Sequence, residues 1–135
     1  MFFVTRRATL LIPSGPDHDP DRLHLHVVLN NPEKPSREVL LVCVTSANVG
    51  AAPDPACLIS AGEHKFVSHD SCVAYRFAAI VSADAIEQRV KEGLFKPHQI
   101  VSTELFERIV DGVFSSKFIA PKFRHFLRGY LDDTD

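Results

Sequence analysis

An almost continuous apolar run near the middle of the chain, residues 39–46 with the sequence VLLVCVTS, constrains the fold more than any other feature. The run is rich in β-branched residues, which suit a pleated strand, and it leaves no polar face for solvent. It therefore predicts a central strand of a sheet. The run ends in Thr45 and Ser46, so two hydroxyl groups stand where this strand leaves the core.

Shorter runs on both sides predict partners for this strand. Residues 22–30, RLHLHVVLN, alternate polar and apolar side chains, which is typical of a half-buried strand. Arg22, His24 and His26 share the polar face of that strand. Loops rich in Pro, Gly and Asp separate the runs. Further strands are expected at residues 8–12, 57–60 and 71–80.

The segment 63–80, EHKFVSHDSCVAYRFAAI, concentrates ionisable and aromatic side chains around the last of these strands. His64 and His69 precede the strand, and Arg76 and Tyr75 lie within it. Strict alternation would place Arg76 on one face and Tyr75 on the other. The residues sharing the face of Arg76 would be Cys72, Ala74 and Ala78. A long cation among small side chains leaves room for an anion, so this segment is a candidate wall of a binding site.

Beyond residue 82 the apolar positions recur at helical spacing, which predicts three helices. The first is expected at residues 85–92, with a capping box at Asp84 and Glu87 and an end at Gly93. The second is expected at residues 103–114, with Ser102 or Thr103 as its cap. The third is expected at residues 121–131 and begins at Pro121. Because strands come first and helices last, the pattern predicts an α+β fold, a compact antiparallel sheet or small barrel with helices packed on it. The four residues after the last helix are expected to fray.

A chain of 135 residues with 45% apolar residues has the size and composition of a single globular domain, residues 1–135. The formal charge of −2 gives no overall attraction to nucleic acid, so a polyanion would need a local basic patch. Three cysteines at wide spacing fit neither a disulfide framework nor a paired zinc site and indicate a reducing compartment. No apolar run reaches membrane-spanning length, and the start MFFVTRR does not look like a leader, so the expected location is the cytoplasm.

Several of these features together resemble the PemK and MazF toxins of type II toxin–antitoxin systems. The resemblance covers most of the chain before residue 118. It rests on RLHLHVVLNNP, on VLLVCVTS, and on a D-S-x-V strand that leads into a short helix and a Gly-Leu pair, here Asp70-Ser71-Cys72-Val73 and Gly93-Leu94. Residues 118–135 have no clear counterpart in the family, so the third helix is an extra layer, a dimer element or a partner site.

The resemblance implies an SH3-like β-barrel with two to three helices, usually a homodimer. Such proteins cleave single-stranded RNA without a metal or other cofactor and are silenced by an antitoxin protein. In the family an Arg at the start of the second strand and a Thr at the end of the third flank the scissile phosphate, and these positions match Arg22 and Thr45. Three parts of the family pattern differ in this chain. The Gly-Asp opening of the first strand is replaced by Arg7-Ala8-Thr9, and the Arg-Pro pair of the second strand by Arg22-Leu23-His24. The acid that follows D-S-x-V in some members is replaced by Tyr75-Arg76.

Cleavage of RNA through a 2′,3′-cyclic phosphate needs a base, an acid, and donors or cations for the growing charge on phosphorus. His24 is the candidate for proton transfer, because an imidazole titrates near neutrality. Arg22 or Arg76 can hold the phosphate bidentately, and Thr45 can donate to a nonbridging oxygen. The candidate substrate-binding residues are Ser46, His64, His69 and Tyr75, the last as a ring that stacks on a base.

Other interpretations of the same residues remain. A non-catalytic SH3-like module that binds a protein partner would account for the missing Arg-Pro pair and acid. His24 and His26 could belong to a metal hydrolase, but two imidazoles without a carboxylate or Cys nearby are a weak signal, and no metal ligands are assigned. Considered singly, His64 and His69 could satisfy loop backbone groups, and Arg76 could pair with an acid across the sheet.

Overall fold

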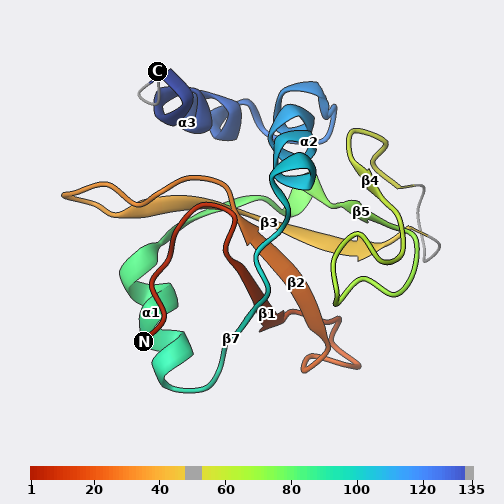
Figure 1. Ribbon diagram of the computed structural model, residues 1–135, viewed down its shortest axis with the longest axis horizontal. Helices are drawn as coiled ribbons and strands as arrows, with labels where there is room; N and C mark the ends of the chain where they lie inside the picture. The colour runs from red at the N-terminus through yellow and green to blue at the C-terminus, as the bar shows by residue number, and fades with distance from the viewer. Residues whose placement is uncertain (48–52, 133–135) are drawn as a thin grey trace.

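The computed structural model describes residues 1–47 and 53–132 as an α+β fold with a seven-stranded sheet and three helices (Figure 1). The strands are β1 (Thr9–Pro13), β2 (Leu23–Val28), β3 (Glu38–Ser46), β4 (Leu58–Ile59), β5 (Ser71–Val73), β6 (Ala79–Ser82) and β7 (Lys96–His98). The helices are α1 (Ala83–Lys91), α2 (Thr103–Ser115) and α3 (Pro121–Asp132). Part of the loop expected after Ser46, residues 48–52, lies outside the described residues. So does most of the expected frayed tail, residues 133–135.

The predicted central strand is confirmed. The strand order is β4-β5-β3-β2-β1-β7, all neighbours are antiparallel, and β6 also pairs with β3. β3 therefore has β2 along one edge and both β5 and β6 along the other. β7 was not expected, because its sequence, Lys-Pro-His, has no apolar alternation.

The sheet is covered on both faces, which explains why residues 39–44 are apolar throughout. One face packs against α2 and α3, and the other packs against α1 and the N-terminal segment. The first core includes Leu25, Val27, Val42, Val44, Ile109 and Leu127. The second core includes Val4, Leu10, Val28, Val39, Leu41 and Ile86. Alternate residues of β3 thus belong to different cores, as the strand period requires.

The two edges of the sheet approach each other without strand pairing. Among the described residues, β4 and β7 form no backbone ladder, so the sheet is not closed. Instead, the loop after β4 reaches the segment after β7 through His64, whose Nε2 lies 2.5 Å from the carbonyl oxygen of Gln99. The hydroxyl of Thr9 donates to the same oxygen at 2.7 Å. The His64 hydrogen bond therefore links the two edges, and Thr9 of β1 holds its acceptor.

The prediction of one continuous strand at residues 71–80 is wrong, because a turn of 3₁₀ helix, Tyr75–Phe77, separates β5 from β6. Val44 pairs with Val73 and Leu41 pairs with Ala79, so a three-residue step along β3 is matched by a six-residue step along its partner. The extra residues form the turn. The alternation that grouped Cys72, Ala74, Arg76 and Ala78 on one face therefore fails after β5.

The helices begin close to the expected positions, with one correction. α1 is capped by Ser82, whose hydroxyl accepts from the backbone N–H of Ala85, and not by Asp84. Asp84 lies in the first turn of α1 and pairs with Arg37. The expected end at Gly93 is confirmed by its φ of 78°, which favours glycine. Ser102 caps α2 as predicted. None of the helices in the described part of the chain has the length and apolarity needed to cross a membrane.

Candidate functional site

A groove of about 500 Å³ lies between the ends of β2 and β3 and the loop before β5. It is lined by most of the predicted site residues: Arg22, His24, Thr45, Ser46 and His69. The register explains this arrangement. Because Leu25 is opposite Val44, the start of β2 lies beside the end of β3. The loop at residues 66–71 forms the opposite wall and adds the partly exposed ring of Phe66.

Arg22 and His24 stand at the β2 side of the groove. Arg22 is half exposed, and its Nε lies 3.0 Å from Oδ2 of Asp19. The Nδ1 atom of His24 is 2.9 Å from the hydroxyl oxygen of Ser14, which orients the ring. Burial, and next the positive charge of Arg22, lower the pKa of His24 below its ordinary value of 6.5. At neutral pH the imidazole is therefore in its neutral form and can accept a proton.

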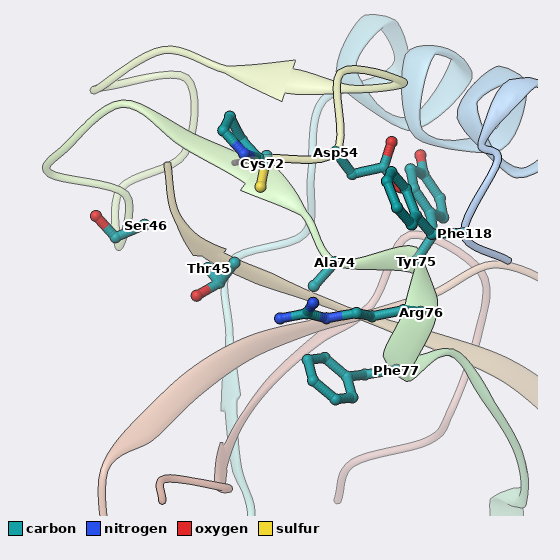
Figure 2. Close-up of a pocket in the computed structure, with 10 residues that line it drawn as sticks. Thr45, Ser46, Asp54, Cys72, Ala74, Tyr75, Arg76, Phe77 and Phe118 are labelled. Atoms are coloured by element: carbon teal, nitrogen blue, oxygen red, sulfur yellow. The ribbon is translucent and has the colours of Figure 1, made fainter. Parts of the chain in front are cut away.

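Thr45 and Ser46 connect the groove to a second, smaller pocket of about 110 Å³ (Figure 2). Both residues are partly buried at the end of β3, where Thr45 pairs with Cys72 and Ser46 pairs with Ser71. Arg76 lines the smaller pocket, and Figure 2 shows its guanidinium on the same side of β5 as Thr45. The two hydroxyl groups thus lie between Arg22 and His24 on one side and Arg76 on the other.

Arg76 has no carboxylate partner among the described residues, so the proposed pairing with an acid across the sheet is not seen. Its guanidinium carbon lies 4.8 Å from the centre of the Phe77 ring, a cation–π contact that holds the long side chain. The 3₁₀ turn causes this position, because it turns Arg76 and Phe77 outward while Tyr75 points into the core. A guanidinium without an acidic partner can bind an anion.

Tyr75 cannot stack on a base, because it has no exposed surface. Its hydroxyl donates to the carbonyl oxygen of Ile109 in α2 at 2.6 Å, so the ring packs between the sheet and the helix. Burial raises the pKa of this phenol far above its ordinary value. The interpretation of Tyr75 as part of a substrate surface is therefore corrected to a core residue.

His64 lies outside the groove and is nearly fully buried. Its Nδ1 accepts from the backbone N–H of Phe66 at 3.0 Å, which leaves Nε2 to donate to Gln99. Both ring nitrogens are thus used within the protein, and the structure supports the alternative that this histidine satisfies loop backbone groups. His69, in contrast, is exposed and lines the groove.

The remaining histidine of β2 and the cysteines do not add a reactive group. His26 is mostly buried, with its Nδ1 3.0 Å from the carbonyl oxygen of His24, and burial lowers its pKa. Burial raises the pKa of the Cys43 thiol to about 11, so the thiolate is scarce at neutral pH. Within the described residues, no three His, Cys, Asp or Glu side chains are grouped so that they could hold a metal ion.

Sequence reasoning missed Asp54, Phe77 and Phe118, which line the smaller pocket beside Thr45. Asp54 is nearly buried, and its carboxylate accepts from the hydroxyl of Ser116 at 2.6 Å and from the backbone N–H of Ala56 at 3.0 Å. Its only signal in the sequence is the turn motif Pro-Asp-Pro. Phe118 comes from the connection between α2 and α3, and no local pattern relates it to β3.

Comparison with known proteins gives no relative: no family model, no curated protein and no solved structure matches this chain. The resemblance to the PemK and MazF toxins therefore rests on the residues quoted above, and the arguments for function rest on the geometry of the site.

Proposed function

We propose that the protein is a metal-independent endoribonuclease of the PemK and MazF type, the toxin of a type II toxin–antitoxin system. The observation that carries the proposal is the groove in which Arg22, His24 and Thr45 lie together, with Ser46 beside them. These residues lie at the start of β2, just before it, or at the end of β3, and the pairing of β2 with β3 brings them to one end of the sheet. They supply a cation, a proton acceptor and hydroxyl donors, which are the groups that phosphodiester cleavage requires.

The roles follow from position and charge. Neutral His24 removes the proton from the ribose 2′-hydroxyl, which attacks the phosphorus and forms the cyclic phosphate. Arg22 holds the phosphate from the side of β2, while Thr45 donates to a nonbridging oxygen. Arg76, in the smaller pocket on the far side of Thr45 and Ser46, is an auxiliary cation for the phosphate charge. His69, on the opposite wall of the groove, is a second imidazole that can give a proton to the leaving 5′-oxygen.

The remaining parts of the proposal concern architecture and partners. The open sheet, linked at its edges by His64, is consistent with an SH3-like barrel that closes through side-chain hydrogen bonds. The proposed protein is a cytoplasmic homodimer that acts on single-stranded RNA and is inhibited by an antitoxin protein. It needs no cofactor, because the imidazole and guanidinium groups supply the proton transfer and charge stabilisation.

The test is cleavage of a labelled single-stranded RNA by purified protein in EDTA. Arg22→Ala and Thr45→Val should each lower the cleavage rate by about 100-fold, because a lost donor to the transition state typically costs 10²–10³ in rate. Arg89→Ala is the matched control, since this exposed arginine pairs with Glu92 on α1. Intact RNA after incubation with the wild type, or full activity in both groove variants, would contradict the proposal.

A second candidate, a non-catalytic module that binds a protein partner, is favoured by one observation. Asp19 pairs with Arg22 at 3.0 Å and neutralises the charge that the phosphate would need. This candidate predicts a stable co-purifying protein and no growth arrest when the chain is expressed. Asp19→Asn separates the two candidates, because freeing Arg22 should raise RNA cleavage if the groove is catalytic and change nothing if it is not.

A further inference from the structure

The small pocket beside Thr45 adjoins the proposed reaction groove. Thr45 and Ser46 line both cavities, so a strand of RNA with its phosphate at these hydroxyl groups would bring a neighbouring nucleotide to the mouth of the pocket. The pocket has no role in the mechanism above except through Arg76. Its walls come from β5, the 3₁₀ turn, the segment containing Asp54, and the connection before α3 (Figure 2).

The size of the pocket limits what it can hold. Its volume is about 110 Å³, whereas an engineered cavity of about 150 Å³ holds benzene. A single six-membered ring can therefore enter part-way, with its remaining edge at the mouth. A bicyclic purine in the same orientation would leave its second ring outside the pocket.

The walls suit the face and the edge of such a ring. Phe118 is 57% exposed and Phe77 is 62% exposed, although rings of this size are usually buried. Both line the pocket. Phe118 offers a stacking surface, and the guanidinium of Arg76, which lies over the Phe77 ring, offers a second plane. Asp54 has two hydrogen bonds from the protein. A carboxylate has about four acceptor positions, so it can still accept from a base N–H.

We propose that this pocket binds one pyrimidine base of the RNA whose phosphate lies in the groove. The base stacks on Phe118 and on the guanidinium plane of Arg76, and its N–H edge faces Asp54. Cytosine and uracil both carry an N–H on that edge, and the small volume covers a single-ring base more completely than a purine, so the pocket favours pyrimidines. This inference rests on the proposed function for the class of ligand, since RNA is the substrate assigned to the adjoining groove.

The test measures binding of RNA that cannot be cleaved. Dye-labelled oligonucleotides of 2′-O-methyluridine, 2′-O-methylcytidine and 2′-O-methyladenosine lack the attacking hydroxyl, so fluorescence anisotropy reports affinity alone. The wild type should bind the pyrimidine oligonucleotides about tenfold more tightly than the adenosine one, a size typical of one stacked base. Phe118→Ala should remove this difference while leaving the affinity for adenosine unchanged.

Phe3→Ala is the control, because Phe3 is exposed beside α1 and lines neither cavity. Equal affinity for all three oligonucleotides, no binding to any of them, or an effect of Phe118→Ala no larger than that of Phe3→Ala would overturn the inference. Failure of the proposed function gives a different result: natural RNA stays intact while the pyrimidine preference persists. Cleavage without that preference would overturn the pocket assignment alone.

Discussion

The imidazole of His24 sets the expected pH dependence of the reaction. As a base it must be neutral, and burial together with Arg22 lowers its pKa below 6.5. We therefore predict that kcat/KM for RNA cleavage falls on acidification, with a midpoint below pH 6.5, as His24 becomes protonated. Arg22→Gln should move this fall to higher pH, because it removes a positive charge that disfavours protonation. A profile without this acidic fall, or with its midpoint above pH 6.5, would contradict His24 as the base, whereas a loss of rate at higher pH reports the proton donor to the leaving oxygen.

Side chains in regular strands could be placed from the sequence, and side chains in turns could not. The alternation of residues 22–30 correctly predicted the strand β2, and residues 39–46 correctly placed Thr45 near a strand end. Tyr75 was misjudged because no local sequence pattern shows that a 3₁₀ turn begins there. His64 was misjudged because no local pattern shows that its ring reaches Gln99. Their hydrogen-bond partners are distant in sequence.

Packing between the 3₁₀ turn and α2 explains a glycine inside that helix. A Cβ added at Gly112 would lie 2.0 Å from the hydroxyl oxygen of Tyr75. We predict that Gly112→Ala lowers the free energy of unfolding by about 1–3 kcal/mol, although alanine is the better helix former. Urea denaturation followed by circular dichroism measures the change.

Gly129 in α3 provides the matched control for Gly112. A Cβ at this position meets nothing within 4 Å, so Gly129→Ala should raise the free energy of unfolding by about 0.5 kcal/mol through helix propensity alone. Destabilisation by both alanines, or by neither, would show that the contact with Tyr75 is not the cause.

α3 covers the first core. Of the alternatives for residues 118–135, this packing agrees with an extra layer. Leu127 has no exposed surface and belongs to the core on the α2 side of the sheet. We predict that Leu127→Ala lowers the free energy of unfolding by about 2–5 kcal/mol, as for other leucines removed from cores. Leu94→Ala, at a site that is 53% exposed, should change it by less than about 0.5 kcal/mol in the same denaturation experiment.

Elements with a clear period were predictable, and those defined by pairing were not. The helices from Ser102 and Pro121 and the strand at residues 39–46 follow from apolar spacing and caps. β7 was missed because its three residues are recognisable only by their pairing with β1. The division of residues 71–80 depends likewise on the partner, since β3 pairs with β5 and β6 in two different registers.

The whole molecule brings the site together through its topology. Antiparallel pairing places the start of β2 beside the end of β3, and the loop before β5 closes the groove from the other side. A second pocket opens across Thr45 and Ser46, formed by segments that meet only in the folded chain. Arg22 and Thr45 were expected from the resemblance and His24 from the chemistry of proton transfer, whereas the pocket required the fold.

Mass spectrometry of the cleavage products tests the central claim most directly. Single-stranded RNA is incubated with the purified full chain in EDTA, and the new ends are identified by mass. Attack by the 2′-hydroxyl, with His24 as the base, predicts fragments that end in a 2′,3′-cyclic phosphate and partners that begin with a 5′-hydroxyl. Intact RNA, or fragments with a 3′-hydroxyl and a 5′-phosphate, would contradict the account.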